Sequence, residues 1–213
     1  MKYKLIMWDW NGTVVDDVKI ALDAVNLMLD RERLPHINLS QYYSYVDTPI
    51  SKFYEHILDL NKISFEKIGA EFNADYASLS ADRLRLNDGF SELWDFFEKS
   101  ACKQVIISSS KLDNILRDAR LLGVCDKFSA ILGADNIRAE SKIERARAFF
   151  HSSGYNSDEC LFIGDTLHDF ETACELGIDC VLTCQGHQSP AQFCKMPVKY
   201  YDKLSSIIAD LSA

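Results

Sequence analysis

The sequence has no excess of positive charge, no long apolar run, and no repeated or low-complexity segment. Its 213 residues carry a formal net charge of −9, which argues against nucleic acid as a partner because a nucleic-acid-binding face is basic. The first apolar stretch, residues 4–8, is too short for a signal peptide and far too short for a membrane span. Hydrophobic residues make up 47% of the chain, so we expect a globular protein with a sizeable core and no membrane partner.

The chain also lacks any Cys-x-x-Cys pair, although it contains seven cysteines. The number is odd, and several cysteines lie in apolar runs, Cys160 and Cys180 especially. We therefore expect reduced, mostly buried thiols in a cytoplasmic protein. The full set is Cys102, Cys125, Cys160, Cys174, Cys180, Cys184 and Cys194.

Short apolar runs alternate with helix-like stretches in most of the chain. The strand-like runs are residues 4–8, 104–107, 128–132, 161–163 and 180–182, and the helix-like stretches are 89–99, 111–122, 142–151 and 169–176. Three of the runs are continuously apolar, which is typical of parallel strands covered on both faces. The pattern predicts an α/β fold with a doubly wound parallel sheet.

Residues 18–83 differ, because they contain no convincing strand. Ile20, Ala24 and Leu27 recur at helical spacing, and residues 34–38 separate this first helix from the later part of the segment. A second crossing to the core is expected near residues 86–89. We predict a core domain of residues 1–16 and 84–213, interrupted by a small helical cap domain of residues 17–83 that covers the end of the first strand.

Acidic residues come directly after two of the predicted strands. Asp9 ends the run 5–8 and precedes a turn at Gly12, and Asp165 comes after the run 161–163. Open α/β sheets bind their ligands at the carboxyl ends of their strands, so these two acids are expected to meet at one edge. Carboxylate oxygens suit a hard divalent cation. The sequence therefore predicts a metal site there.

Four separated motifs, covering essentially the whole length, make this chain resemble the haloacid dehalogenase superfamily of phosphohydrolases. They are Asp9-x-Asn11-Gly12-Thr13, Ser108 after an apolar run, Lys142, and Gly164-Asp165-x-x-x-Asp169. The helical insert is similar to the small cap of the phosphoglycolate-phosphatase-like branch. The chain departs from the family pattern at Asn11, where an Asp is usual, and at Ile143, where a Pro commonly follows the Lys.

The resemblance implies a Rossmann-like core, a Mg²⁺ cofactor and a phosphatase mechanism on a small phosphorylated substrate. Asp9 would be the nucleophile that forms an aspartyl-phosphate. Mg²⁺ would be held by Asp9, the backbone carbonyl of Asn11 and Asp165, with Asp169 acting through water. Catalytic roles would fall to Asp9, Asn11, Ser108 and Lys142, and phosphate binding to Gly12, Thr13, Ser108, Ser109 and Lys142.

Structural roles compete with some of these assignments. Asp169 could cap the helix after it, and Ser108 could cap the helix at 111–122, where Ser110 is the better candidate. Lys142 could be a solvated surface lysine, with Lys111 as the rival cation beside the phosphate. The pair Ser141 and Glu144 has capping-box spacing, which would place Lys142 in a first helical turn.

Four further polar residues are candidates for structural or site roles. Asp16 and Asp17 precede the first cap helix, so N-capping is expected, and contact with substrate at the hinge is the alternative. His168 is interpreted as a loop or helix-start residue. His187 comes after the last predicted strand and could line the rim of the site.

Asn11 affects the mechanism most, because an amide cannot exchange a proton with the leaving group and the attacking water as a carboxyl group does. That exchange is typically worth about 10²–10⁴ in rate. The leaving group could need little protonation, a cap residue or the substrate could supply the proton, or turnover could be slow. The main hypothesis is a Mg²⁺-dependent phosphatase for a small phosphorylated metabolite. The alternative is a weakly active or inactive protein that binds phosphate or a metabolite.

Two other activities of the superfamily are disfavoured. A phosphonate hydrolase needs a cap lysine, and Lys19 is present, but the sequence around it does not resemble that branch. A dehalogenase would not need the metal-type acids of the fourth motif. Specificity would come from the cap, around Tyr42, Tyr43, Tyr45 or residues 47–49, although these tyrosines could equally be cap core. The sequence gives no indication of the oligomeric state.

Overall fold

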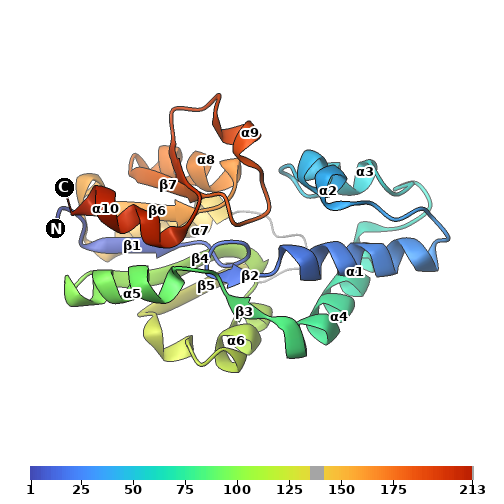
Figure 1. Cartoon of the computed structure of the whole chain (residues 1–213), viewed down its shortest axis with the longest axis horizontal. Coiled ribbons are helices and arrows are strands. Elements are labelled where there is room, and N and C mark those ends of the chain that lie inside the picture. Colours follow the sequence, from blue (N-terminus) through green and yellow to red (C-terminus); the bar gives the residue numbers. More distant parts are fainter. Residues whose placement is uncertain (135–141, 213) are drawn as a thin grey trace.

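A sheet of six parallel strands lies at the centre of the larger part of the molecule in the computed structural model, which describes residues 1–134 and 142–212 (Figure 1). The strand order is β5-β4-β1-β6-β7-β8, which places the first strand in the middle. The parallel sheet confirms the predicted α/β class. The strands are β1 (Leu5–Trp8), β4 (Lys103–Lys111), β5 (Ala130–Ala134), β6 (Cys160–Gly164), β7 (Asp179–Thr183) and β8 (Lys199–Tyr201).

Helices cover both faces of this sheet. Consecutive residues of a strand point to opposite faces, so a strand that is apolar at every position must be covered on both sides. Ile6 and Trp8 of β1 pack toward α5 and α6, with the Trp8 ring 5.4 Å from that of Phe90. Leu5 and Met7 pack toward α7 and α8. The doubly wound arrangement explains why β1 is apolar at every position. The helices are α5 (Phe90–Lys99), α6 (Leu112–Leu121), α7 (Lys142–Ser153), α8 (Leu167–Leu176), α9 (Pro190–Phe193) and α10 (Ile207–Leu211).

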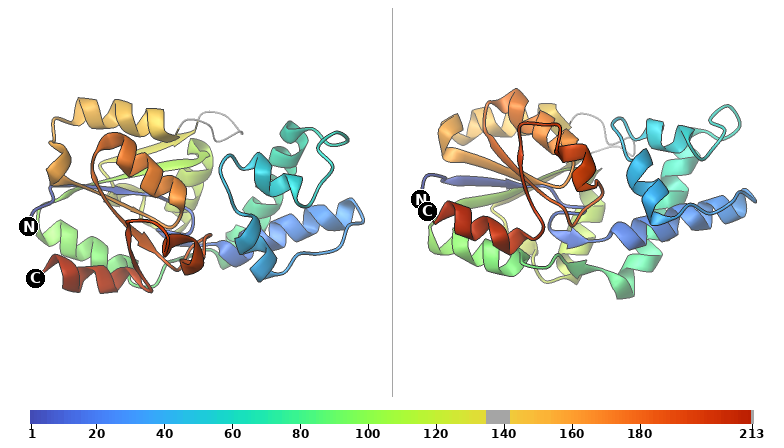
Figure 2. Two further views of the ribbon diagram at one scale, coloured as in Figure 1. Left: turned by 90° about the horizontal axis from the view of Figure 1, so that it is seen from above. Right: turned by 45° about the horizontal axis from the view of Figure 1, so that its top comes forward.

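The four helices of residues 18–83 form a separate body beside the sheet, called the cap below (Figure 2). They are α1 (Val18–Arg31), α2 (Leu39–Tyr45), α3 (Ser51–Glu55) and α4 (Phe65–Arg83). Their apolar faces pack into a core of their own, around Val25, Met28, Phe53 and Ile68. Residues 18–83 are all described and contain no strand, as expected. The exact boundaries at residues 16/17 and 83/84 stay a prediction.

The chain crosses between these two bodies at two adjacent places. β2 (Val15–Asp16) pairs antiparallel with β3 (Arg85–Leu86). Asn87, directly after β3, donates from its side-chain amide to the carbonyl of Gly12 at 2.7 Å. The second crossing therefore holds the loop after β1 in place. This crossing lies near residues 86–89, as expected from the sequence.

Some predicted boundaries were wrong. β4 continues to Lys111, whereas the sequence ended this strand at residue 107 and began a helix at 111. The pairing of β4 with β5 shifts between Ile107 and Lys111, so the polar residues there extend the strand past its apolar part. β2, β3 and β8 were missed because two or three residues are too short to show a period.

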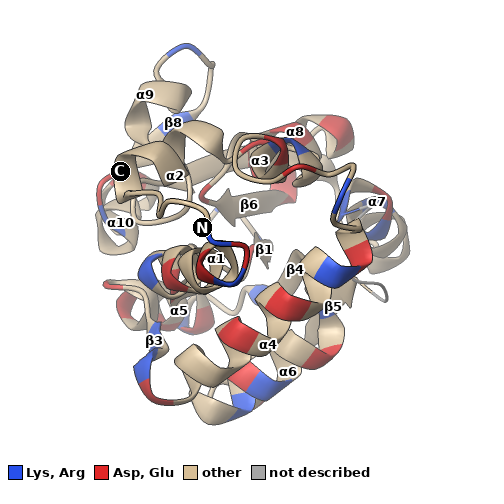
Figure 3. Ribbon diagram, turned by 90° about the vertical axis from the view of Figure 1, so that its right-hand side faces the viewer, with Lys and Arg blue, Asp and Glu red and all other residues tan. Residues whose placement is uncertain are grey.

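Both chain ends lie at the end of the core remote from the four cap helices (Figure 1). Seen from the cap side, α4 and α6 carry both acidic and basic residues, with more acidic than basic ones along α4 (Figure 3). All seven cysteines are free, as predicted. The expectation that most of them are buried was wrong, because only Cys102 and Cys160 are buried. Among the described residues, none of the helices combines the length and apolar character that crossing a bilayer requires.

Candidate functional site

Asp9 and Asp165 lie side by side at the carboxyl edge of the sheet. β1 and β6 are neighbours, with Trp8 opposite Ile163, and the Asp9 amide donates to the carbonyl of Ile163 at 2.9 Å. Both acids are buried, with 7% and 0% of their surfaces exposed. The sheet therefore brings together two residues that are remote in sequence. This confirms the prediction that Asp9 and Asp165 meet at one edge of the sheet.

Asp169 and Lys142 complete this buried cluster. The Lys142 ammonium lies 2.5 Å from Asp9 Oδ1 and 2.5 Å from Asp169 Oδ1. It is 2% exposed, so the interpretation of Lys142 as a solvated surface lysine is wrong. One oxygen from each of Asp9, Asp165 and Asp169 lies within 4.8 Å of the other two.

The charges of the cluster fit a divalent cation. Burial raises the pKa of Asp9 to about 6 even though Lys142 opposes it, and the Asp169 carboxylate adds to the rise. Burial also raises the pKa of Asp165 well above its usual range, against a smaller effect from His187. Three buried carboxylates thus face one ammonium, and an oxygen-only donor set with excess negative charge is what Mg²⁺ prefers.

The Asp165 carboxylate is fixed by its surroundings. Its Oδ1 accepts from the Thr13 hydroxyl at 2.9 Å, and its Oδ2 accepts from the backbone N–H of His187 at 2.6 Å. A methyl group on Gly12 would lie 2.4 Å from Asp165 Oδ2, and one on Gly186 would lie 2.1 Å from it. Glycine is therefore required on both sides of this acid, and the contribution of the loop at Gly186 was not visible in the sequence.

If Asp165 takes part in the phosphatase reaction that the sequence predicts, Gly12→Ala is expected to reduce turnover by about 10²-fold beyond any effect of folding, because a displacement of about 1 Å in a catalytic group costs that much. Gly12 has φ +72°, so the left-handed strain must be separated from the clash with Asp165. Gly123 has φ +66° and nothing within 4 Å. Gly123→Ala supplies the same strain of about 1–2 kcal/mol without the clash. Equal turnover in the two variants, measured by phosphate release, would contradict this role for Gly12.

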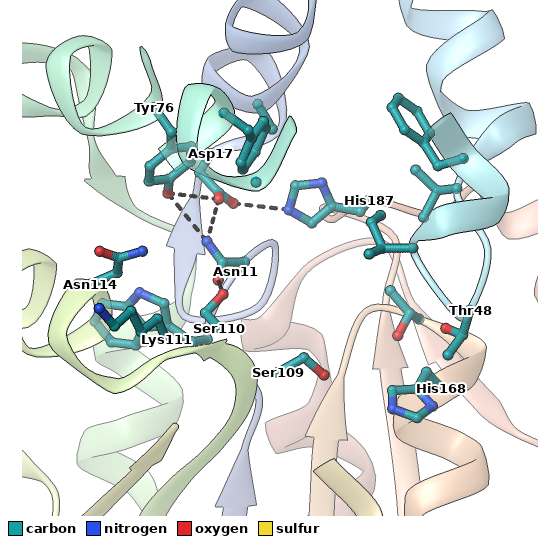
Figure 4. Close-up of a pocket in the computed structure, with 18 of the residues that line it drawn as sticks. Asn11, Asp17, Thr48, Tyr76, Ser109, Ser110, Lys111, Asn114, His168 and His187 are labelled. Carbon is teal, nitrogen blue, oxygen red and sulfur yellow. Dashed lines mark hydrogen bonds and ion pairs between the residues drawn. The ribbon is translucent and has the colours of Figure 1, made fainter. Parts of the chain in front are cut away.

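The Asn11 side chain belongs to a hydrogen-bond network between core and cap (Figure 4). Its amide nitrogen donates to Asp17 Oδ2 at 2.6 Å and to the Tyr76 hydroxyl at 3.2 Å. Its amide oxygen accepts from the Ser110 hydroxyl at 2.5 Å. An amide suits this position because it donates to a carboxylate and accepts from a hydroxyl at the same time.

Asp17 and His187 form an ion pair in the same network. His187 Nε2 lies 3.2 Å from Asp17 Oδ1, and the Tyr42 hydroxyl is 2.8 Å from His187 Nδ1. Burial disfavours a charged imidazole, but Asp17 raises the pKa of His187 to about 9. Burial likewise opposes the charge on Asp17, yet His187 and the donors Asn11 and Tyr76 hold its pKa below the usual value.

Asp17 was expected to cap a helix and does not do so through its side chain. It stands at the N-cap of α1 without a side-chain capping bond, because its oxygens accept from Gly12, Asn11, Tyr76 and His187. Asp16 is exposed in β2. His187 lies deeper than the rim suggested from sequence, and His168 stands in the first turn of α8, as expected.

Thr166 stands at the N-cap of α8, and Asp169 stands at the third helical position. Asp169 Oδ2 accepts from the backbone of Thr166 at 3.0 Å and from its hydroxyl at 2.8 Å. The same carboxyl group contacts Lys142 through its other oxygen. The structural and the candidate functional role of Asp169 therefore coexist. The predicted cap at Ser141 lies outside the described residues.

The serines near the end of β4 divide between two positions. Ser108 is 2% exposed, and its hydroxyl accepts from the Ser110 backbone N–H at 3.1 Å. Ser110 caps no helix, because α6 begins at Leu112, and its hydroxyl is used by Asn11. Ser109, Ser110 and Lys111 line a cavity between the core and the cap.

This cavity has a volume of about 480 Å³. From the core it is lined by Asp9, Asn11, Ser109, Lys142 and Asp165, together with His187 and others. Gly12, Thr13, Ser108 and Asp169 are not among the lining residues, and Thr13 donates to Asp165 instead. A phosphate-binding role for Gly12, Thr13 and Ser108 stays a prediction.

Known proteins resemble the chain over nearly its whole length. It is 23% identical over 191 residues to a phosphoglycolate phosphatase of Xanthomonas campestris pv. campestris, covering 87% of this chain and 85% of the relative. It is also 23% identical to a 5'-nucleotidase of Pseudomonas aeruginosa, covering 85% and 82%. A haloacid dehalogenase-like hydrolase from Streptococcus pneumoniae superposes with a TM-score of 0.86 at 18% identity, covering 99% of both chains.

The profile of the haloacid dehalogenase-like hydrolase family matches residues 6–183. That range begins within β1 and ends with the last residue of β7, so it includes every residue of the acidic cluster. The chain belongs to the haloacid dehalogenase-like hydrolases.

Proposed function

We propose that this protein is a Mg²⁺-dependent phosphatase that hydrolyses a small phosphorylated metabolite through an aspartyl-phosphate on Asp9. One observation carries the proposal: the buried Asp9 carboxylate, bound by Lys142 beside Asp165, lines a cavity between the core and the cap. The relatives named phosphoglycolate phosphatase and 5'-nucleotidase support phosphate monoesters as the substrate class. The free cysteines support a cytoplasmic location.

Asp9 acts as the nucleophile in this proposal. Its carboxylate attacks phosphorus, the bond to the leaving oxygen breaks, and water then cleaves the aspartyl-phosphate and restores Asp9. Lys142 neutralises the carboxylate and the phosphoryl oxygens, because phosphoryl transfer depends mainly on positioning and charge. Ser109 stands at the cavity wall, where it would hydrogen-bond the phosphoryl group.

Mg²⁺ would be held by Asp9, Asp165 and the backbone carbonyl of Asn11, and Asp169 would contact it through water. When bound, it would supply positive charge to the phosphoryl oxygens. Thr13 and the His187 backbone would hold Asp165 in place for it. The cap helices and residues 17–83 as a whole would exclude water from the reacting groups.

The alternative is a phosphate- or metabolite-binding protein with weak or no turnover. Asn11 motivates it, because its amide hydrogen-bonds Ser110, Asp17 and Tyr76 and has no acidic proton to give to a leaving group. Turnover of esters with good leaving groups, which need little protonation, separates the slow enzyme from the binder.

Metal removal tests the proposal. The protein freed of divalent cations should lose turnover of phosphate monoesters, and Mg²⁺ should restore it and raise the melting temperature. Asp165→Asn should lose both responses, because it removes a buried carboxylate from the cluster. Asp158→Asn, at an exposed position, should keep both. Turnover that is independent of Mg²⁺, or a response that survives Asp165→Asn, would refute the proposal.

A further inference from the structure

The cavity extends from the acidic cluster far into the cap, and its cap wall is aromatic. Residues from all four cap helices contribute to it. Of the cap residues that line the cavity, in these helices and in the loop between α2 and α3, six are aromatic and five are aliphatic. The rings belong to Tyr42, Phe53, Tyr54, Phe65, Phe72 and Tyr76, and the aliphatic residues are Ala21, Val25, Val46, Pro49 and Ile50.

The cap wall also carries no positive charge. The cap is described throughout, and none of its lysines or arginines lines the cavity. Several of them are in ion pairs elsewhere on the cap, such as Arg31 with Asp75 at 2.5 Å and Arg83 with Asp23 at 2.7 Å. The charged cap residues that do line the cavity, Asp17 and Asp47, are acidic.

The aromatic cap wall and its lack of lysine and arginine restrict which leaving group the cavity can hold. A second anionic group on the substrate would meet aromatic rings and two acids that already hold the nearest cations, Asp17 with His187 and Asp47 with Lys52, and burying an unpaired anion is costly. An uncharged ring would be favoured there, since aromatic side chains bind rings through apolar burial and edge or offset contacts. Figure 4 shows Tyr76 on the side of the cavity where Asn11 and Asp17 lie.

Besides Lys142, a second core lysine, Lys111, lies on the cavity wall. It stands beside Asn114 (Figure 4), and its ammonium is 3.6 Å from Asp113. Its side chain is 42% exposed. An exposed ammonium that already has an acidic neighbour contributes little, so it does not compensate for the acidic and aromatic cap.

We propose that the substrate is a phosphate monoester of an uncharged alcohol that carries an aromatic or heteroaromatic ring, and that esters with a second anionic group are poor substrates. This inference rests on the proposed phosphatase function. It assigns the cap wall formed by α1, α2, α3 and α4 to the ring of the leaving group, while Asp9 and Lys142 act on its phosphate.

The test compares three alkyl phosphates whose leaving groups all need protonation: 2-phenylethyl phosphate, ethyl phosphate and 2-phosphoglycolate. With Mg²⁺ present, kcat/KM should be at least about tenfold higher for the phenyl ester than for either of the others, since burying a ring of that size is worth this much. Equilibrium binding of the same three compounds to Asp9→Asn gives a second readout that does not need turnover. The order of affinities should be the same.

A matched pair of variants places the preference in the cap. Ile50 lines the cavity and is 37% exposed, while Leu27 does not line it and is 39% exposed. Ile50→Arg should lower the preference for the phenyl ester over 2-phosphoglycolate by about fivefold or more through the added charge, and Leu27→Arg should leave it unchanged.

The outcomes separate the two proposals. Mg²⁺-dependent hydrolysis in which 2-phosphoglycolate equals or exceeds the phenyl ester would overturn the substrate inference and leave the phosphatase intact. Absence of hydrolysis of all three esters would count against the phosphatase, and the binding order would still decide the inference. Equal effects of Ile50→Arg and Leu27→Arg would remove the cap wall as the cause of any preference.

Discussion

Asp9→Asn is expected to reduce phosphatase turnover by about 10⁴-fold or more, because an amide does not form the covalent intermediate and loss of a nucleophile removes the whole sequence of steps. The variant should nevertheless fold. Burial raises the pKa of Asp9 to about 6, so the fold disfavours its ionised form at neutral pH, and a neutral amide of the same shape removes that cost. Lys142 keeps its other partner, Asp169, at 2.5 Å.

Phosphate release measures the loss of turnover in Asp9→Asn, and the melting temperature shows whether this variant folds. Wild-type protein quenched during turnover should gain the mass of one phosphoryl group, and Asp9→Asn should not. Asp158→Asn, which neutralises an exposed acid, is the control for removal of one negative charge. A variant at position 9 that still turns over would exclude the aspartyl-phosphate.

The pairing of Asp9 with Asp165 could be predicted from the sequence because each comes directly after a buried strand. Parallel strands bring their carboxyl ends to one edge whatever their separation along the chain. The helical nature of residues 18–83 was equally accessible, since apolar residues recur there at helical spacing and form one buried core. Both inferences need only local patterns and one topological rule.

The network around Asn11 could not be predicted in the same way. Asp17 has the sequence position of a helix cap, and only the folded chain shows that its carboxylate accepts from Asn11, Tyr76 and His187. His187 comes 170 residues after Asp17, and nothing in its neighbourhood marks a partner. Gly186 is similar, since its need for glycine arises from the approach of Asp165.

Lys142 shows where the resemblance added what local patterns lacked. As a residue in a first helical turn, a lysine faces the unfavourable end of the helix dipole, and the pattern alone would leave it in solvent. Its side chain instead lies between Asp9 and Asp169. The energetic reason is the pair of buried carboxylates of Asp9 and Asp169, which are placed by β1 and α8 and not by the helix that carries the lysine.

Asn11→Asp alone is expected to be a poor route to a faster enzyme. The Asn11 amide nitrogen lies 2.6 Å from Asp17 Oδ2, so the substitution would bring a half-buried carboxylate into contact with the buried carboxylate of Asp17. Such pairs hold a shared proton or repel each other. We expect the melting temperature of this variant to fall at neutral pH and to recover toward acid pH, where the pair is protonated.

The double variant Asn11→Asp with Asp17→Asn exchanges the two groups and keeps one carboxylate and one amide in contact. The acid then stands two residues after the nucleophile, where it can protonate a leaving alkoxide. For an alkyl phosphate, kcat is expected to rise by about 10²–10⁴, the usual range for general acid–base catalysis. Thermal unfolding at neutral pH should show the double variant to be more stable than Asn11→Asp.

Asp17→Asn alone is the control, because it removes the charged partner of His187 without adding an acid near the leaving group. It should lower the pKa of His187 and leave kcat for the alkyl phosphate unraised. If the double variant gains no activity yet still binds phosphate monoesters with Mg²⁺, the missing acid was not the obstacle and the binding protein becomes the better account. If Asn11→Asp alone gains the full rate without loss of stability, the contact with Asp17 does not explain why this chain carries an amide at position 11.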